Sequence, residues 1–142
     1  MKSVPLILRD HREELWRRWV DALEDRVAAD YRELMASQLG ERMLRTLVDE
    51  LIAFAQSEQY ERAGLLRAAQ ERTRRETAHR LSMGFTVLDT VVGLHVLRAA
   101  MTDVLADAVA VEEMPSFADT LDQLKDVNAV LDQHVCACLS LA

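Results

Sequence analysis

The chain has 142 residues, of which 50% are hydrophobic and 29% charged, and this predicts one compact domain over residues 1–142 rather than a disordered or fibrous protein. No apolar run reaches the about 18 residues of a membrane-spanning helix, so we expect no membrane insertion and a cytoplasmic location. The net charge is −7, and residues 83–142 hold nine acidic against two basic residues, which disfavours nucleic-acid binding because a phosphate backbone would be repelled.

Apolar residues recur every three or four positions along nearly the whole chain, which is the helical period. Only four Gly and two Pro are present, too few breakers for the many short strands of an all-β fold. The sequence therefore predicts an all-α, single-domain bundle of about five helices.

The first two helices are expected over residues 5–28 and from Ser37 to about Ser57. Pro5 suits the first turn of the former, and the Ser37 hydroxyl suits the N-cap of the latter. The apolar face of the second helix places Leu51 in the core.

A third helix is expected from about Tyr60 to Gly84, with a strongly polar middle. Gly84 is expected in the left-handed conformation that ends many helices, and Phe85 covers the core beside this turn. Thr86, with Asp89 three residues later, predicts the N-terminus of a fourth helix of about 25 residues.

The fourth helix is the least polar segment, so we expect it at the centre of the bundle. Its apolar face is predicted to carry Val91, Val92, His95, Leu105 and Val109. Val91 and Leu105 join Leu51 as predicted core residues.

Residues 112–115 are expected to break this helix, and Ser116 with Asp119 opens a fifth helix that runs nearly to the end. Apolar positions along it alternate in spacing between four and three, as in a coiled-coil seam. The seam residues are Phe117, Leu121, Leu124, Asn128, Leu131, Val135 and Cys138. Either the seam joins two copies with Asn128 facing its counterpart, or it closes the chain's own bundle and Asn128 meets a polar partner there.

Two histidines are candidates for chemistry, each beside a simpler structural interpretation. His95, on an apolar helical face, could be an axial haem ligand or a core histidine with a hydrogen-bond partner. His79 precedes Gly84 in a string that faintly resembles a histidine phosphotransfer motif, but Ser82 and Met83 stand where that motif has Lys and Gly. The simpler interpretation of His79 is a solvated side chain.

The other candidate residues give weaker indications of a functional site. His134 and Cys138 share a helix face, but a structural zinc site needs four ligands, so we expect no metal and no other cofactor. Cys136 and Cys138 point to nearly opposite sides of a helix, so a mutual disulfide is not expected. Trp19 should lie in the core and Trp16 at its edge.

Four arginines in the polar third helix could grip an anion, but interleaved Glu71 and Glu76 favour a solvated, charged face. These are Arg72, Arg74, Arg75 and Arg80. Neither a nucleophile with its base nor a glycine-rich phosphate loop is evident, so we expect no enzyme.

Two stretches of the chain resemble the N-terminal domain of the RsbT co-antagonist proteins, helical sensor modules of bacterial stressosome-type regulators. They are His11-Arg12-Glu13-Glu14-Leu15 continuing to Trp19, and Gly84-Phe85-Thr86 followed by Leu88, Val91, Leu97 and Arg98. The resemblance implies a bundle-like or globin-like domain that dimerises, perceives a stimulus and passes it to an output domain or a partner protein. It names no ligand residues.

From the residues and the resemblance together we expect a non-catalytic signalling domain of the bacterial stress response. It would form a homodimer and relay a stimulus through its last helix, with Leu121, Leu124, Asn128, Leu131 and Val135 in the interface. The alternatives are phosphotransfer through His79 and a haem-based sensor using His95.

Overall fold

A computed structural model describes residues 3–110 and 116–142, and these residues contain helices and no strand. The elements are α1 (Val4–Asp10), α2 (Arg12–Ala22), α3 (Ala29–Ala36), α4 (Gln38–Gln56), the short 3-10 helix η1 (Gln59–Glu61), α5 (Arg62–Ser82), α6 (Val87–Ala110) and α7 (Phe117–Leu139). The all-α prediction is confirmed, with seven α-helices where about five were expected. None of the described helices is both long and apolar enough to traverse a bilayer.

The additional helices arise in the N-terminal third, where a single helix over residues 5–28 is wrong. The chain turns at His11 between α1 and α2, and it leaves the helix after Ala22 through a turn in which Asp25 has a left-handed φ of 62°. Helix α3 follows, with no capping side chain to announce it. Gly40 then allows α4 to begin beside α3, since a Cβ there would lie 1.9 Å from the carbonyl oxygen of Met35.

The predicted helix starts and stops elsewhere are confirmed. The hydroxyls of Ser37, Thr86 and Ser116 each accept a hydrogen bond from a backbone N–H of the helix that follows, and Ser57 ends α4. Such side chains replace partners that the first helical turn lacks. The break expected at residues 112–115 lies outside the described residues.

The turn between α5 and α6 has the expected conformation. Gly84 has a φ of 94°, its N–H donates to the carbonyl of Leu81 at 3.1 Å, and the N–H of Phe85 donates to the carbonyl of Arg80 at 3.1 Å. These two bonds define a Schellman C-cap, which needs a left-handed residue. The Phe85 ring meets Tyr31 edge to face, 5.9 Å between centroids, so it covers the core beside the turn.

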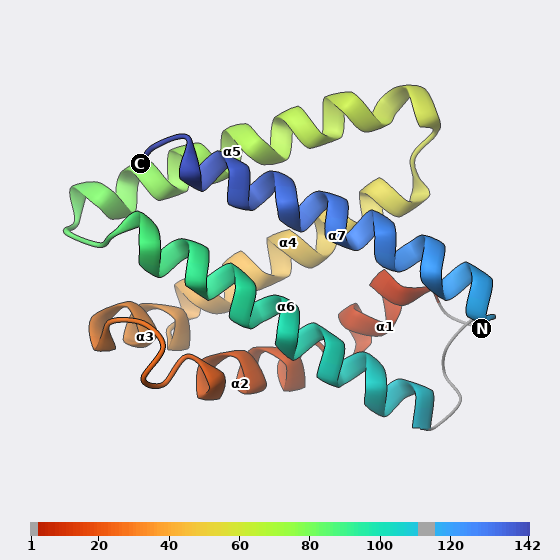
Figure 1. Cartoon of the computed structure of the whole chain (residues 1–142), viewed down its shortest axis with the longest axis horizontal. Helices are drawn as coiled ribbons and strands as arrows, with labels where there is room; N and C mark the ends of the chain where they lie inside the picture. The colour runs from red at the N-terminus through yellow and green to blue at the C-terminus, as the bar shows by residue number, and fades with distance from the viewer. Residues whose placement is uncertain (1–2, 111–115) are drawn as a thin grey trace.

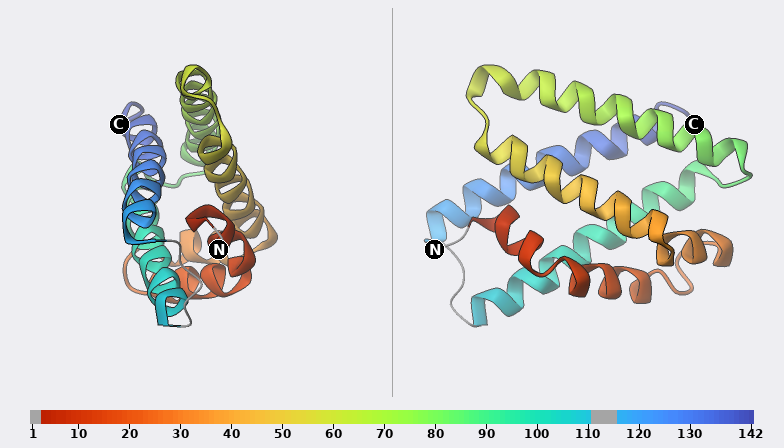
Figure 2. Two further views of the ribbon diagram at one scale, coloured as in Figure 1. Left: turned by 90° about the vertical axis from the view of Figure 1, so that its right-hand side faces the viewer. Right: turned by 180° about the vertical axis from the view of Figure 1, so that it is seen from behind.

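The long helices form two layers (Figures 1 and 2). In the left view of Figure 2, α6 and α7 make one layer and α4 and α5 the other, with α1–α3 at the lower end. Helices α5 and α7 run parallel, because Thr73 contacts His134 and Thr77 contacts Cys138 with the same offset of 61 residues. Helix α4 runs antiparallel to α5, with Glu50 on Arg72 and Met43 on Arg80.

Helix α6 lies in the core as expected, but its buried face differs from the predicted one. Leu105 is buried, whereas Val91 and Val92 are half-buried and His95 and Val109 are exposed. The buried residues are Thr90, Gly93, Val96, Leu97, Ala100, Met101, Val104, Leu105 and Ala108. Helix α6 has small or apolar residues on nearly every side, so its sequence alone does not show which side faces the core.

The seam on α7 is divided between core and surface. Leu131 and Cys138 are buried within the chain, Phe117 and Leu121 are exposed, and the remaining seam residues are half-buried. The side-chain oxygen of Asn128 accepts a hydrogen bond from Arg98 at 3.0 Å. Asn128 therefore has a polar partner in its own chain, and Leu131 cannot lie in an interface between copies.

Core burial makes a stability prediction for two of the residues singled out from the sequence. Leu51 is fully enclosed and Val91 only half-buried. We expect Leu51→Ala to lower the free energy of unfolding by about 2–5 kcal/mol and Val91→Ala by about 1 kcal/mol or less. Urea unfolding followed by circular dichroism measures both, and equal costs would contradict the placement of α6.

Candidate functional site

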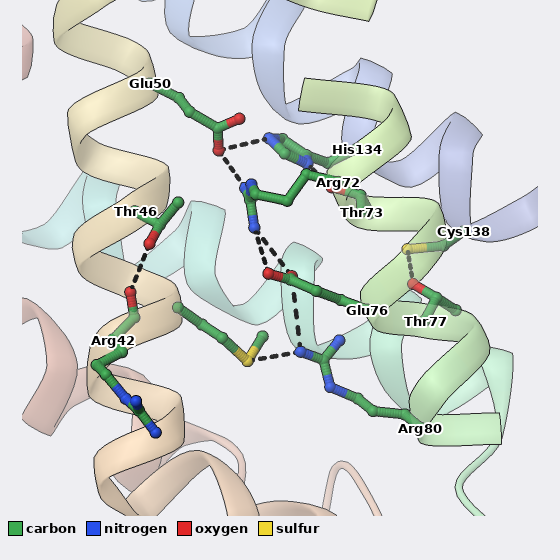
Figure 3. Close-up of polar contacts among 11 residues, drawn as sticks. Arg42, Thr46, Glu50, Arg72, Thr73, Glu76, Thr77, Arg80, His134 and Cys138 are labelled. Carbon is green, nitrogen blue, oxygen red and sulfur yellow. Dashed lines mark hydrogen bonds and ion pairs between the residues drawn. The ribbon is translucent and has the colours of Figure 1, made fainter. Parts of the chain in front are cut away.

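Helix α5 buries a polar stripe against α7 and α4 (Figure 3). Its inward residues are Ala69, Thr73, Thr77 and Arg80, spaced as one face of a helix. The Thr73 hydroxyl hydrogen-bonds Nδ1 of His134, and the Thr77 hydroxyl contacts the Cys138 sulfur at 3.5 Å. Two turns of α7 are thus joined to two turns of α5 through polar side chains in the interior.

Arg72 is the centre of an ion network at the α4 side of this stripe. One of its Nη atoms bonds Glu50 on α4, and the other bonds both carboxylate oxygens of Glu76, at 2.8 and 2.9 Å. Hydrogen bonds between a guanidinium and carboxylates are charge-assisted and belong to the strong class. Burial opposes the charge on Arg72, but the two carboxylates outweigh it and raise its pKa.

Arg80 is more deeply buried than Arg72 and has poorer partners. Its side chain is 6% exposed, one Nη atom lies 2.7 Å from the Met43 sulfur, and the nearest Glu76 oxygen is 3.7 Å away. A thioether is a weak acceptor, and 3.7 Å exceeds hydrogen-bond distance. Its Nε atom is buried without any hydrogen-bond partner.

His134 is buried with its ring held in one orientation. Burial first, and then the charge of Arg72, lower its pKa to about 4, so the ring is neutral near pH 7. Its Nδ1 bonds Thr73, and its Nε2 lies 3.6 Å from a Glu50 oxygen with no hydrogen bond. Burial raises the pKa of Glu50, and its bond to Arg72 opposes this rise.

A cavity of about 40 Å³ adjoins the cluster, between α5, α6, α4 and the N-terminal helices. Arg80, Thr90 and His134 contribute polar groups to its wall, whereas Trp19, Leu47 and Leu97 contribute apolar ones. One water molecule needs about 10–15 Å³ of such volume, so the space suits a group of roughly three or four non-hydrogen atoms.

A second feature is a row of uncharged, mostly exposed residues along the outer face of α6, a helix that also exposes Asp103 and Asp107. Leu88 is 69% and Val109 59% exposed. Between them the outward positions are spaced alternately by four and three, and they are Leu88, Val92, His95, Ala99, Thr102, Ala106 and Val109. We call this set the α6 stripe. Beside it α7 exposes Phe117, which is 80% exposed, as well as Leu121 and Leu139.

Both histidine candidates are exposed side chains. His95 is exposed on the α6 stripe and does not line the cavity, so its expected place on a buried apolar face, which the haem-ligand and core-histidine interpretations shared, is wrong. His79 is an exposed residue of α5, as its simpler interpretation predicted. Nothing in its surroundings tests phosphotransfer.

The arginine cluster is split by the helix. Arg74 and Arg75 are exposed, but Arg72 and Arg80 turn inward, so a fully solvated face is the wrong interpretation. His134 and Cys138 do share a face, yet each bonds a threonine of α5. Within the part of the chain that the structure describes, no three His, Cys, Asp or Glu side chains gather as metal ligands.

The tryptophans lie as expected. Trp19 is buried and its indole N–H donates to the carbonyl of Gly93 at 2.9 Å, while half-buried Trp16 donates to the carbonyl of Met35 at 2.9 Å. Sequence reasoning missed the polar cluster as a unit. Its only signal was the three-and-four spacing of Thr73, Thr77 and Arg80 within a helix read as solvated.

Comparison with protein-family models, with curated proteins and with solved structures gives no significant match to this chain. The resemblance to the RsbT co-antagonist proteins therefore stays a prediction from the quoted residues. The fold and the site describe the protein as an all-α helical bundle with a cluster of ionic side chains in its interior.

The neutral state of His134 predicts a pH dependence of stability. Because the folded pKa of about 4 lies below the ordinary value of 6.5, the unfolded chain binds the proton more readily. This residue's contribution is therefore complete above pH 6.5 and is lost as the pH falls towards 4, by about 3 kcal/mol at most. Urea unfolding between pH 7 and pH 4 should show a shallower loss for His134→Gln than for the wild type.

The exposed histidine on the α6 stripe supplies the matched control for this experiment. His95→Gln also removes one imidazole, but from the surface. It should keep the wild-type pH profile. A His134→Gln profile that coincides with that of His95→Gln would contradict the assignment.

Proposed function

We propose that the chain is a non-catalytic signalling domain that forms a homodimer and relays a stimulus through α7. The observation that carries the proposal is the double role of this helix. The inner face of α7 places His134 and Cys138 in the buried polar cluster, while its outer side exposes Phe117 and Leu121. One rigid element thus connects an interior polar site to an apolar surface.

The outer face of α6 and α7 suits a second copy of the chain. The α6 stripe has the coiled-coil spacing and its own residues include no Asp, Glu, Lys or Arg, although Asp103 and Asp107 are also exposed on α6. Large apolar residues are also exposed at both ends of the stripe and on the start of α7, the helix that packs against α6. Such apolar surfaces commonly mark interaction sites.

The interface proposed here differs in part from the one expected from the seam. Leu131 belongs to the core and cannot take part in the interface. The other four residues keep some exposed surface for it: Leu121 is exposed, and Leu124, Asn128 and Val135 are half-buried. Asn128 would contribute through its bond to Arg98, which ties α7 to α6 and so fixes the face that both helices present.

The relay would use the packing of α7 against α5. Packed helices have discrete arrangements, so a change at a buried contact is passed on as a small shift of the helix rather than absorbed locally. A change at the Thr73–His134 contact would move α7, and with it the surface that carries Leu121.

The oligomeric state tests the interface. We expect the wild type to be a dimer at about 50 μM by light scattering, and Val109→Glu to weaken the dimer at least tenfold, because a buried charge without a partner costs several kcal/mol. Tyr60→Glu is the matched control, since Tyr60 is 84% exposed on η1, away from this face. A wild type that stays monomeric at this concentration, or equal effects of the two variants, would overturn the interface.

Coupling between cluster and surface tests the relay. Thr73→Val keeps the shape of the side chain but removes the hydroxyl that bonds His134, and we expect it to change the dimer dissociation constant about fivefold or more. Thr46→Val removes a hydroxyl that bonds only the Arg42 carbonyl of its own helix and should leave the constant unchanged. A Thr73→Val dimer of wild-type affinity would separate the cluster from assembly and contradict the relay.

A further inference from the structure

The cavity beside α5 has hydrogen-bond donors that no acceptor of the protein satisfies. Four of the residues that line it have a buried polar atom without a hydrogen-bond partner, namely Nε of Arg72, Nε of Arg80, Oγ1 of Thr90 and Nε2 of His134. The guanidinium carries only donors. An occupant that completes this wall must therefore supply acceptors.

Arg80 supplies the positive charge for such an occupant. Both oxygens of Glu76 are bonded to Arg72, and Glu50 is bonded to Arg72 as well. Arg80 is left with a thioether at 2.7 Å and a carboxylate at 3.7 Å, although its side chain is 6% exposed. Arg80 has an ion pair with Glu76, which also lines the cavity, but no carboxylate lies within hydrogen-bond distance of its guanidinium. A small anion in the cavity would supply the charge-assisted hydrogen bonds that this buried guanidinium lacks.

Shape and size narrow the class of anion. About 40 Å³ accommodates roughly three or four non-hydrogen atoms. The planar fork of a guanidinium matches a planar carboxylate or a similar oxyanion, with two parallel N–H···O bonds. The apolar side of the wall, with Trp19, Leu47 and Leu97, lowers the local polarity and so strengthens these bonds.

We infer that this cavity binds a small, planar, monovalent oxyanion, of the size of formate, nitrate or bicarbonate, held by the Arg80 guanidinium. Beyond Arg80, the Thr90 hydroxyl lies on the same wall and can donate to the anion. The inference rests on the proposed function only for its consequence, that the anion would be the stimulus, because the occupied cavity touches both Arg80 of α5 and His134 of α7.

Binding of formate to the full chain tests the inference. Thermal unfolding is followed over a series of sodium formate concentrations against sodium chloride at equal ionic strength, and ¹³C-formate is titrated with protein by NMR. We expect a saturable rise of Tm with formate alone and a saturable change of the formate signal. Equal Tm shifts in the two salts, or a formate signal that does not respond, would overturn the site.

Two variants locate the anion. Arg80→Lys keeps the charge and loses the fork, and it should weaken formate binding about tenfold. Leu94→Phe enlarges a half-buried side chain of the cavity wall and should abolish binding while leaving Arg80 in place, which keeps the test valid if Arg80→Lys fails to fold. Arg62→Lys is the matched control, because Arg62 pairs with Asp126 outside the cavity. Formate affinity equal to wild type in Arg80→Lys or in Leu94→Phe would overturn the assignment.

The outcome is distinguishable from that of the assembly experiments. Formate binding by a chain that stays monomeric would support the anion site and contradict the proposed dimer. A dimer whose formate titration shows no binding would support the proposed dimer and contradict the anion site. Both measurements use the wild-type chain, so neither depends on the survival of a variant.

Discussion

The bundle depends on the pairing of Arg72 with Glu50 and Glu76. Helix α5 has few large apolar residues on its inner side, so it cannot dock by hydrophobic burial alone, and its charged groups must find partners on α4 and along itself before it leaves water. Once Arg72 holds both carboxylates, the threonines of α5 can approach α7 closely. Removing one member of such a buried set is more damaging than replacing the whole set by apolar residues, since the remaining charge is left unpaired. The cavity, the orientation of His134 and the isolation of Arg80 all follow from this arrangement.

The same arrangement divides α7 between two roles. Small and polar residues on one side interlock with α5 at an offset of 61 residues, and the large apolar residues of its N-terminal part are left outside. A wholly apolar contact would allow α7 to slide along α5, whereas the hydrogen bonds at Thr73 and Thr77 fix the register of the two helices. The exposed α6 stripe runs beside it and is uncharged, although this part of the chain carries the acidic surplus. A single helix, α7, thereby has one side in the polar interior and another side on the exposed apolar surface.

Local chemistry made the helix boundaries predictable, because a capping hydroxyl or a left-handed glycine acts on its nearest neighbours in sequence. Ser37, Gly84, Thr86 and Ser116 all behave as their types predict. The buried side of α6 was not predictable, because small and apolar residues occur all around this helix. His95 and Val109 were therefore expected on the buried side, but both are exposed. The cluster was not predictable either, since the partners of Arg72 and His134 come from helices 22 and 61 residues away. Alternating Arg and Glu on α5 is equally typical of a solvated helix, and only tertiary packing distinguishes the two.

The parallel pairing of α5 with α7 also sets the order in which the chain can become stable. Contacts between residues 61 positions apart carry a cost in loop-closure entropy, and the hydrogen-bond partners of Thr73 and Thr77 lie on α7 and not on α6, the helix that follows α5 in the chain. Until α7 has been synthesised, the Thr73 and Thr77 hydroxyls lack His134 and Cys138 as partners and are better solvated by water. Folding of the two-layer core is thus delayed until α7 has been synthesised, and the docking of α7 makes the transition cooperative.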